Sequence, residues 1–122
     1  MRKYKNINTT RIKRYTTICR ALSEPHRWLI LQYLLLQQSP CPVGEVVGQL
    51  KIAHATVSHH LQQLELAGLI RRRRKGRFIY CQAKGKAITE LAAFLRQLGR
   101  DDNASDEQPQ ERLWDAFSHI WG

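Results

Sequence analysis

The stretch that most limits the fold of this chain lies between residues 69 and 82. Six of the seven positions from Arg71 to Arg77 are basic, and Gly76 is the exception. β-prone residues flank this run, and a two-residue turn, Lys75-Gly76, with glycine second, predicts a β-hairpin. Lys75 and Arg77 crowd the tip, and their like charges repel each other unless an anion neutralises them, so the hairpin suits a phosphate backbone or a narrow minor groove. The alternative is a basic edge strand that only prevents aggregation.

The segments before and after this hairpin show helical periodicity. Apolar residues recur at helical spacing over five ranges: 9–22, 25–37, 43–50, 53–67 and 84–98. Pro25 suits a first helical turn, with Ser23 or Glu24 as the cap, and Gly68 suits a helix stop. The second helix is apolar almost all round, which predicts a central, buried element. The order of elements predicts a mostly α fold with a small β-hairpin, a winged helix-turn-helix.

The flanking segments differ in composition from this domain. Residues 1–8 are basic and polar and are predicted to form a flexible arm, whereas 9–98 form the folded domain. Residues 99–110 are an acidic linker, and 111–122 carry an apolar arc that predicts an amphipathic C-terminal helix. That arc comprises Leu113, Trp114, Phe117, Ile120 and Trp121. The helix could enlarge a dimer core, or the acidic tail could compete with DNA for the basic surface.

The charge of the chain predicts an anionic partner. The 20 Lys and Arg residues against 10 Asp and Glu residues give +10, but residues 1–98 alone hold 18 basic and four acidic side chains, a net of +14. Such a balance is typical of proteins that bind nucleic acid. No apolar stretch is long enough for a secretory signal or a membrane span, so a cytoplasmic location is expected.

Catalytic and cofactor signatures are missing from the sequence. There is no Gly-rich phosphate loop, no nucleophile elbow and no pair of carboxylates in the body of the chain, so neither an enzyme nor a cofactor is expected. Three cysteines, an odd number without a C-x-x-C spacing, argue against a disulfide framework or a zinc knuckle.

The helix over residues 53–67 has one face suited to reading DNA. Val57, Leu61 and Leu64 share its apolar side, and the opposite side carries short hydrogen-bonding groups, an imidazole and no carboxylate. Major-groove readers need such groups, although an ordinary solvated face is the alternative. His60 leans toward the apolar side and is expected to pack. The candidates for bases and nearby phosphates are His54, Ala55, Thr56, Ser58, His59 and Gln62. Those for the flanking backbone or minor groove are Arg71, Arg73, Arg74, Lys75 and Arg77.

The chain resembles the ArsR/SmtB family of bacterial winged-helix repressors. The resemblance covers roughly residues 17–82 and is carried by Arg20 to Arg27, Val43 to Val46, Ala55 to Leu61, Leu64 to Ile70 and Arg73 to Tyr80. It implies a repressor that binds an imperfect inverted repeat in double-stranded DNA and leaves it when an inducer binds. It also implies a homodimer through the first and last core helices, here Ile12, Tyr15, Cys19, Ile88, Leu91 and Leu95.

The sequence departs from the family pattern at three places, and two of these departures leave the inducing signal unidentified. Pro42 and Gly44 stand where metalloid sensors carry two thiols, and Glu90 is the sole possible ligand on the last core helix, so no metal site is expected. Ala53 replaces the usual capping Ser or Thr of the reading helix.

Two alternatives to the family function stay open. Cys41 precedes a helix start, where amide dipoles can lower a thiol pKa, so a redox- or sulfur-responsive regulator using Cys41 with Cys19 or Cys81 is one of them. Buried, unreactive thiols are the competing interpretation. The other alternative is a winged-helix module that binds protein or RNA and has no operator.

Overall fold

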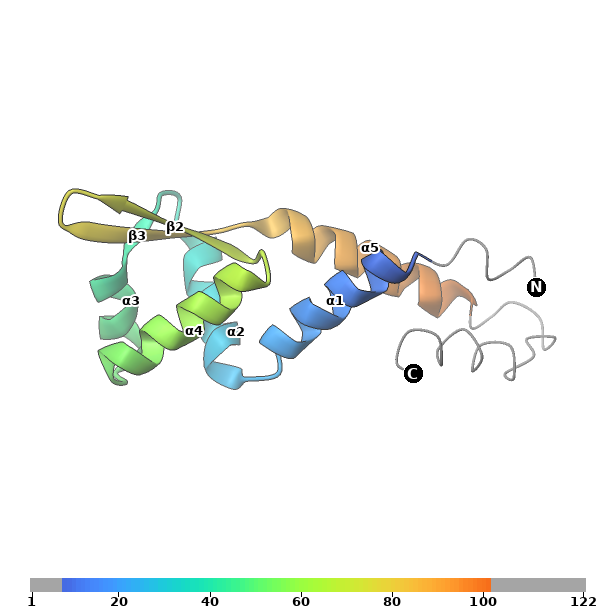
Figure 1. Ribbon diagram of the computed structural model, residues 1–122, viewed down its shortest axis with the longest axis horizontal. Coiled ribbons are helices and arrows are strands. Elements are labelled where there is room, and N and C mark those ends of the chain that lie inside the picture. The colour runs from blue at the N-terminus through green and yellow to red at the C-terminus, as the bar shows by residue number, and fades with distance from the viewer. Residues whose placement is uncertain (1–7, 102–122) are drawn as a thin grey trace.

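The computed structural model describes residues 8–101 and shows a helical body with a β-sheet at one end (Figure 1). Within these residues, five helices and three strands follow each other. They are α1 (Thr9–Ala21), α2 (Pro25–Leu36), β1 (Cys41–Pro42), α3 (Val43–Leu50), α4 (His54–Leu66), β2 (Ile70–Lys75), β3 (Phe78–Ala83) and α5 (Gly85–Asp101). The helix-turn-helix is α3 and α4, and β2 with β3 forms the wing. This is the predicted winged helix-turn-helix fold.

The sheet has a third strand that the sequence did not indicate. Its order is β1-β3-β2, with both pairs antiparallel and Cys41 opposite Cys81. Pro40 and Pro42 lie too close together for one helix and give no strand signal of their own. A two-residue strand with a proline is too short for any periodicity, and proline is tolerated there because β1 lies at the sheet edge.

The hairpin turn lies one residue later than predicted. Lys75 pairs with Phe78, so the two loop residues are Gly76 and Arg77, and glycine is first rather than second. Gly76 has a φ of 65°, which glycine adopts without strain. Glycine at the first of two loop positions is typical of a type II′ hairpin turn, whose twist matches that of the strands.

The core lies where α2 and α4 meet the inner face of the sheet. Ile18, Ile30, Leu61, Leu64 and Leu69 are fully buried there, and Cys81 joins them from β3. The prediction that α2 is buried all round was wrong for the single chain. Only Ile30, Leu31 and Leu34 are buried on it, whereas Trp28, Leu29, Leu35 and Leu36 are more than half exposed.

The helix ends follow local chemistry. Glu24 caps α2 by accepting a hydrogen bond from the Arg27 amide, with Pro25 in the first turn. Lys51 closes α3 in the left-handed conformation, at a φ of 56°, and starts the tight turn to α4. Gly68, at a φ of 78°, follows the end of α4 as predicted. Ala53 gives α4 no side-chain cap, which costs about 1 kcal/mol relative to serine.

Helix α5 extends to Asp101, past the predicted end at residue 98. The predicted C-terminal amphipathic helix, residues 102–110 of the predicted acidic linker and the predicted arm up to residue 7 lie outside the described residues. None of the helices between residues 8 and 101 has the length and the apolar composition needed to cross a membrane.

Candidate nucleic-acid interface

One side of α4 is buried and the other is open. Val57, Leu61 and Leu64 are fully buried, as their spacing predicted. The six predicted base-contacting residues lie on the remaining surface. His54, Ala55, Thr56, His59 and Gln62 are exposed, and Ser58 is half-buried with its Oγ 3.3 Å from the His54 Nδ1. This surface of α4 offers hydroxyl, amide and imidazole groups and carries no carboxylate.

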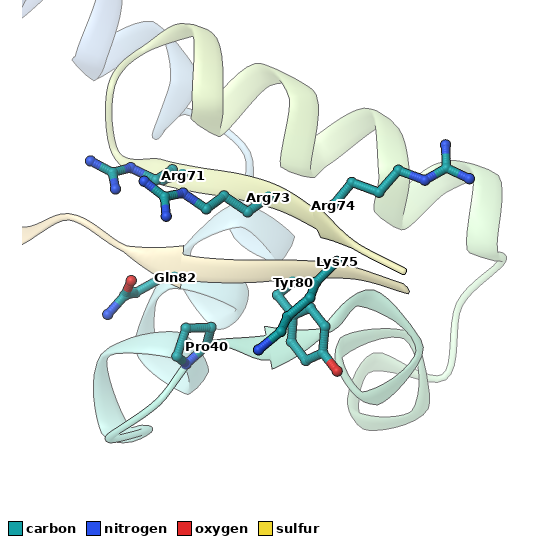
Figure 2. A pocket seen from close by; sticks show the side chains of 7 residues that line it. All are labelled: Pro40, Arg71, Arg73, Arg74, Lys75, Tyr80 and Gln82. Carbon is teal, nitrogen blue, oxygen red and sulfur yellow. The ribbon is translucent and has the colours of Figure 1, made fainter. Parts of the chain in front are cut away.

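The wing carries a row of cations on one face of its sheet. Arg71, Arg73 and Lys75 alternate along β2 and line a groove of about 540 Å³ together with Tyr80 and Gln82 of β3 (Figure 2). Arg74 points away from Arg71 and Arg73 in this view and also borders the groove. Arg77 is exposed in the turn. Strand geometry thus gathers three of the five predicted wing cations on a single surface.

Sequence reasoning missed the contact that holds the wing against α4. The Arg72 backbone N–H donates to Glu65 Oε2 at 3.2 Å, and the Arg72 Nε donates to Glu65 Oε1 at 2.9 Å. Both side chains are partly shielded, with 27% of Arg72 and 37% of Glu65 exposed. Glu65 sits in the last turn of α4 and Arg72 near the start of β2, so this pair fixes the wing relative to the helix. A lone acid seven residues before an arginine, across the Gly68 turn, is the signal that could have found it.

We expect Glu65→Ala to weaken DNA binding about fivefold while costing under about 1 kcal/mol in the free energy of unfolding. Removing a negative charge would by itself tighten DNA binding, so a loss can come only from a loosened wing. The matched control is Glu90→Ala, which removes a salt bridge to Arg14 (3.1 Å) between α5 and α1, outside α4 and the wing. Fluorescence anisotropy measures both affinities, and equal behaviour of the two variants would refute the role of Glu65.

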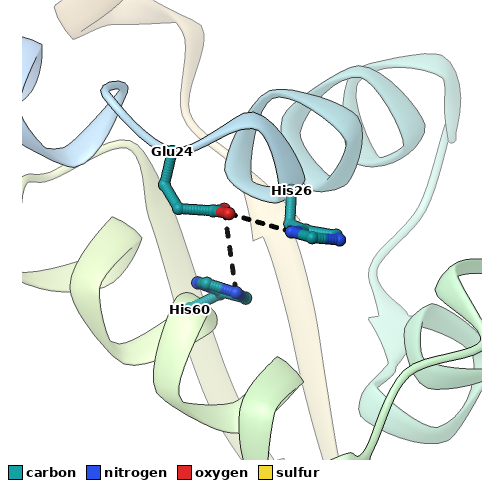
Figure 3. A group of neighbouring side chains, drawn as sticks. All are labelled: Glu24, His26 and His60. Carbon is teal, nitrogen blue, oxygen red and sulfur yellow. Dashed lines mark hydrogen bonds and ion pairs between the residues drawn. The ribbon is translucent and has the colours of Figure 1, made fainter.

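A cluster of three polar side chains, Glu24, His26 and His60, lies behind the exposed face of α4. His60 is 7% exposed, as predicted for a packed residue, and its Nε2 lies 3.7 Å from Glu24 Oε2 (Figure 3). His26 Nδ1 lies 2.9 Å from Glu24 Oε1. The hydrogen bond with His26 lowers the pKa of Glu24, and burial lowers the pKa of His60. Near neutral pH the group therefore holds a carboxylate against a neutral imidazole.

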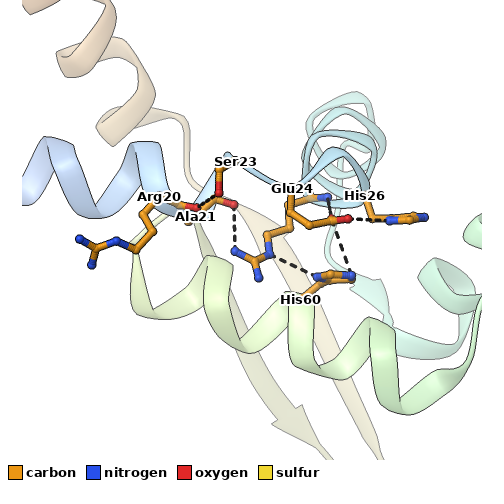
Figure 4. Close-up of polar contacts among 7 residues, drawn as sticks. Arg20, Ala21, Ser23, Glu24, His26 and His60 are labelled. Carbon is orange, nitrogen blue, oxygen red and sulfur yellow. Dashed lines mark hydrogen bonds and ion pairs between the residues drawn. The ribbon is translucent and has the colours of Figure 1, made fainter.

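Arg27 extends this group to the turn between α1 and α2. Its Nε donates to His60 Nδ1 at 3.2 Å, and one of its terminal nitrogens donates to the Ala21 carbonyl at 3.1 Å. Figure 4 shows Ala21 at the end of α1 and His60 on α4, the two residues that these bonds connect. Glu24, Arg27 and His60 thereby connect the end of α1, the start of α2 and the middle of α4. This network holds α4 from the side opposite its exposed face.

The surroundings of Cys41 do not give its thiol the lowered pKa that a sensor cysteine needs. Cys41 is buried, and burial raises the pKa of its thiol instead of lowering it, helped by the nearby Glu45 carboxylate. Burial also raises the pKa of Cys81 to about 11. Cys19 is exposed. The helix start after Cys41 therefore does not produce the low thiol pKa that a reactive cysteine needs.

Comparison with known proteins places this geometry in a family. Residues 22–73 match a family described as a helix-turn-helix domain. The chain is 36% identical to the transcriptional repressor SdpR of Bacillus subtilis over 87 residues, which cover 70% of this chain and 94% of that protein. It is 32% identical over 82 residues to a homolog of the cadmium resistance regulatory protein CadC of Staphylococcus aureus, covering 66% of this chain and 67% of that protein.

A solved structure shares the fold of this chain. The crystal structure of an ArsR family transcriptional regulator superposes with a TM-score of 0.69 at 25% identity, covering 76% of this chain and 94% of that one. Fold, sequence likeness and the exposed α4 and wing agree with one another and with a regulator rather than an enzyme. The chain belongs to the ArsR family of winged helix-turn-helix, DNA-binding transcriptional regulators.

Proposed function

We propose that this protein is a cytoplasmic transcriptional repressor that binds an imperfect inverted repeat as a homodimer and is released by a signal. The observation that carries the proposal is the pairing of two surfaces. An exposed, carboxylate-free face of α4 lies beside a wing whose cations share one side, and the Glu65–Arg72 pair ties the two together. Two similar proteins are named as a transcriptional repressor and a resistance regulator, which supports the repressor role.

The proposed contacts divide between bases and backbone. His54, Ala55, Thr56, Ser58, His59 and Gln62 on α4 address base edges and nearby phosphates in the major groove. Arg71, Arg73, Arg74, Lys75 and Arg77 hold the flanking backbone or minor groove. The base contacts set the sequence preference of the protein, and the wing contacts supply affinity for any duplex.

A second copy of the chain would cover an apolar surface that the single chain leaves open. Helices α2 and α5 line a groove of about 510 Å³, bordered by Trp28, Leu35, Ile88, Leu91 and Leu95 among others. Trp28, Leu35, Leu95 and Leu98 are each more than half exposed. So much contiguous apolar surface is typical of a protein interface.

The six residues expected at the dimer interface differ in how much of their surface is exposed in the single chain. Cys19 and Leu95 are exposed, and Ile12 and Ile88 are half-buried, so these four have surface left to bury. Tyr15 and Leu91 are 5% and 8% exposed within one chain, with Tyr15 packed on Phe94 of α5 at 5.0 Å between ring centroids. We therefore propose that Tyr15 and Leu91 pack under the residues that form the interface and hold them in position.

Binding-site selection from random duplexes, followed by footprinting, tests the proposed function, and the duplex it recovers is called the operator below. We expect His59→Ala to change the bases recovered at one position of each half-site, because a good base contact discriminates by about 1–3 kcal/mol. Arg77→Ala should instead weaken binding to all duplexes and reduce the salt slope by about 1. If both variants lower affinity equally without changing the selected sequence, the division of roles is wrong.

A further inference from the structure

Three side chains with metal-ligating atoms converge away from the proposed DNA contacts. Glu24 and His26 come from the start of α2, and His60 comes from the middle of α4 (Figure 3). One donor atom from each lies within 4.8 Å of the other two. His60 is buried, and the other two are half-buried, so the cluster is shielded on one side and open to water on the other.

The donor set is that of an open zinc site. Two imidazole nitrogens and one carboxylate oxygen provide three protein ligands and leave a fourth, tetrahedral position for water. Ligands bound at about 2.0–2.1 Å in a tetrahedron lie about 3.3 Å from each other. His26 Nδ1 lies 2.9 Å from Glu24 Oε1, and His60 Nε2 lies 3.7 Å from Glu24 Oε2, so each imidazole faces a different oxygen of the same carboxylate. With one donor atom of each residue within 4.8 Å of the other two, small side-chain movements bring the three ligands to tetrahedral spacing.

The hydrogen bond from Arg27 to His60 and a cation bound by His60 are two alternative arrangements of the same imidazole. The Arg27 Nε–H donates to His60 Nδ1, which leaves the ring proton of a neutral His60 on Nε2, facing Glu24. A cation on Nε2 requires that proton to move to Nδ1, and Nδ1 then no longer accepts from Arg27. Likewise the proton on His26 Nδ1 moves to Nε2. Cation binding thus exchanges the Arg27–His60 hydrogen bond for a bridge from α2 to α4, while Arg27 can keep the Ala21 carbonyl.

We propose that Glu24, His26 and His60 bind one borderline divalent cation of the zinc class per chain. The bridge joins the N-terminal end of α2 to the helix that carries the proposed base contacts, and it goes beyond the proposed function because DNA binding does not require it. The absence of a thiol from the cluster favours Zn²⁺, Co²⁺ or Ni²⁺ over soft ions.

The test is titration of the full, metal-free chain with Zn²⁺ alone, followed by calorimetry or competition with a chromophoric chelator. We expect one Zn²⁺ per chain and a rise in the melting temperature on binding. His26→Ala and Glu24→Gln should each weaken Zn²⁺ affinity at least about tenfold. His26 is half-exposed, so its loss leaves the core intact, and circular dichroism verifies the fold of each variant. His59→Gln is the matched control, since it removes the neighbouring imidazole on α4 and should leave Zn²⁺ affinity unchanged.

Co²⁺ reports on the donor atoms directly. Visible d–d bands without a thiolate charge-transfer band, lost in His26→Ala, would support the site. The proposal is overturned if the wild-type chain binds no Zn²⁺, or if His26→Ala and Glu24→Gln retain wild-type affinity. It is also overturned if His59→Gln weakens binding equally, or if the Co²⁺ spectrum shows thiolate ligation. Operator binding is measured separately on the metal-free His26→Ala variant. This measurement distinguishes a failure of the zinc-site proposal from a failure of the proposed function in DNA binding.

Discussion

Replacing Arg71, Arg73 and Lys75 together by alanine is expected to weaken operator binding about 100-fold at moderate salt. These three exposed side chains lie on one face of β2 and border the same groove, so they can meet one strand of phosphates together. Three lost phosphate contacts should also reduce the slope of log affinity against log salt by about 2.7.

The control for the wing variant removes three charges from elsewhere. Lys13, Lys84 and Lys86 are exposed on α1 and around the start of α5, away from the wing tip. Their triple alanine variant has the same net charge, and it should change operator affinity and the salt slope much less. Anisotropy titrations at several salt concentrations measure both quantities. Equal losses in the two triple variants would show that net charge alone, without the geometry of the wing, accounts for binding.

We expect Leu64→Ala to lower the free energy of unfolding by about 2–5 kcal/mol, which is a large part of the stability of a domain this size. Leu64 is fully buried in the core beside the sheet, and this contact helps to hold the exposed side of α4 in place. The truncation leaves a cavity that tightly packed neighbours cannot fill. Urea denaturation followed by circular dichroism measures the loss.

Leu66→Ala provides a control two residues along the same helix. Leu66 is 71% exposed, so the same chemical change there should alter the stability by no more than about 0.5 kcal/mol. If the two variants were equally stable, Leu64 would not be the core residue that the fold assigns, and the orientation of α4 would be wrong. Operator binding by Leu64→Ala should fall in step with the folded fraction.

The sequence was most informative where one local pattern decides the outcome. The spacing of Val57, Leu61 and Leu64 identified the inner side of α4, and it left the predicted DNA face exposed. Gly68 ends α4, and the run of arginines is a strand of the wing, because glycine conformation and strand alternation act over a few residues.

Features that depend on distant contacts could not be read from the sequence. Helix α2 is apolar all round, so only its neighbours decide that Ile30 is buried and Leu36 exposed. Strand β1 exists because Cys41 meets Cys81 across 40 positions of sequence. The approach of His60 to Glu24 likewise requires the folded arrangement of α4 against α2.

Helix α4 and the wing are proposed to read duplex DNA as parts of a two-fold symmetric repressor. Footprinting of the full chain on its selected operator, with the stoichiometry measured at the same salt, tests this most directly. We expect two protected half-sites related by two-fold symmetry, two chains per duplex, and affinity that falls steeply as salt rises. No preference for the selected duplex over random DNA, or preferential binding of RNA or of a protein, would contradict the account.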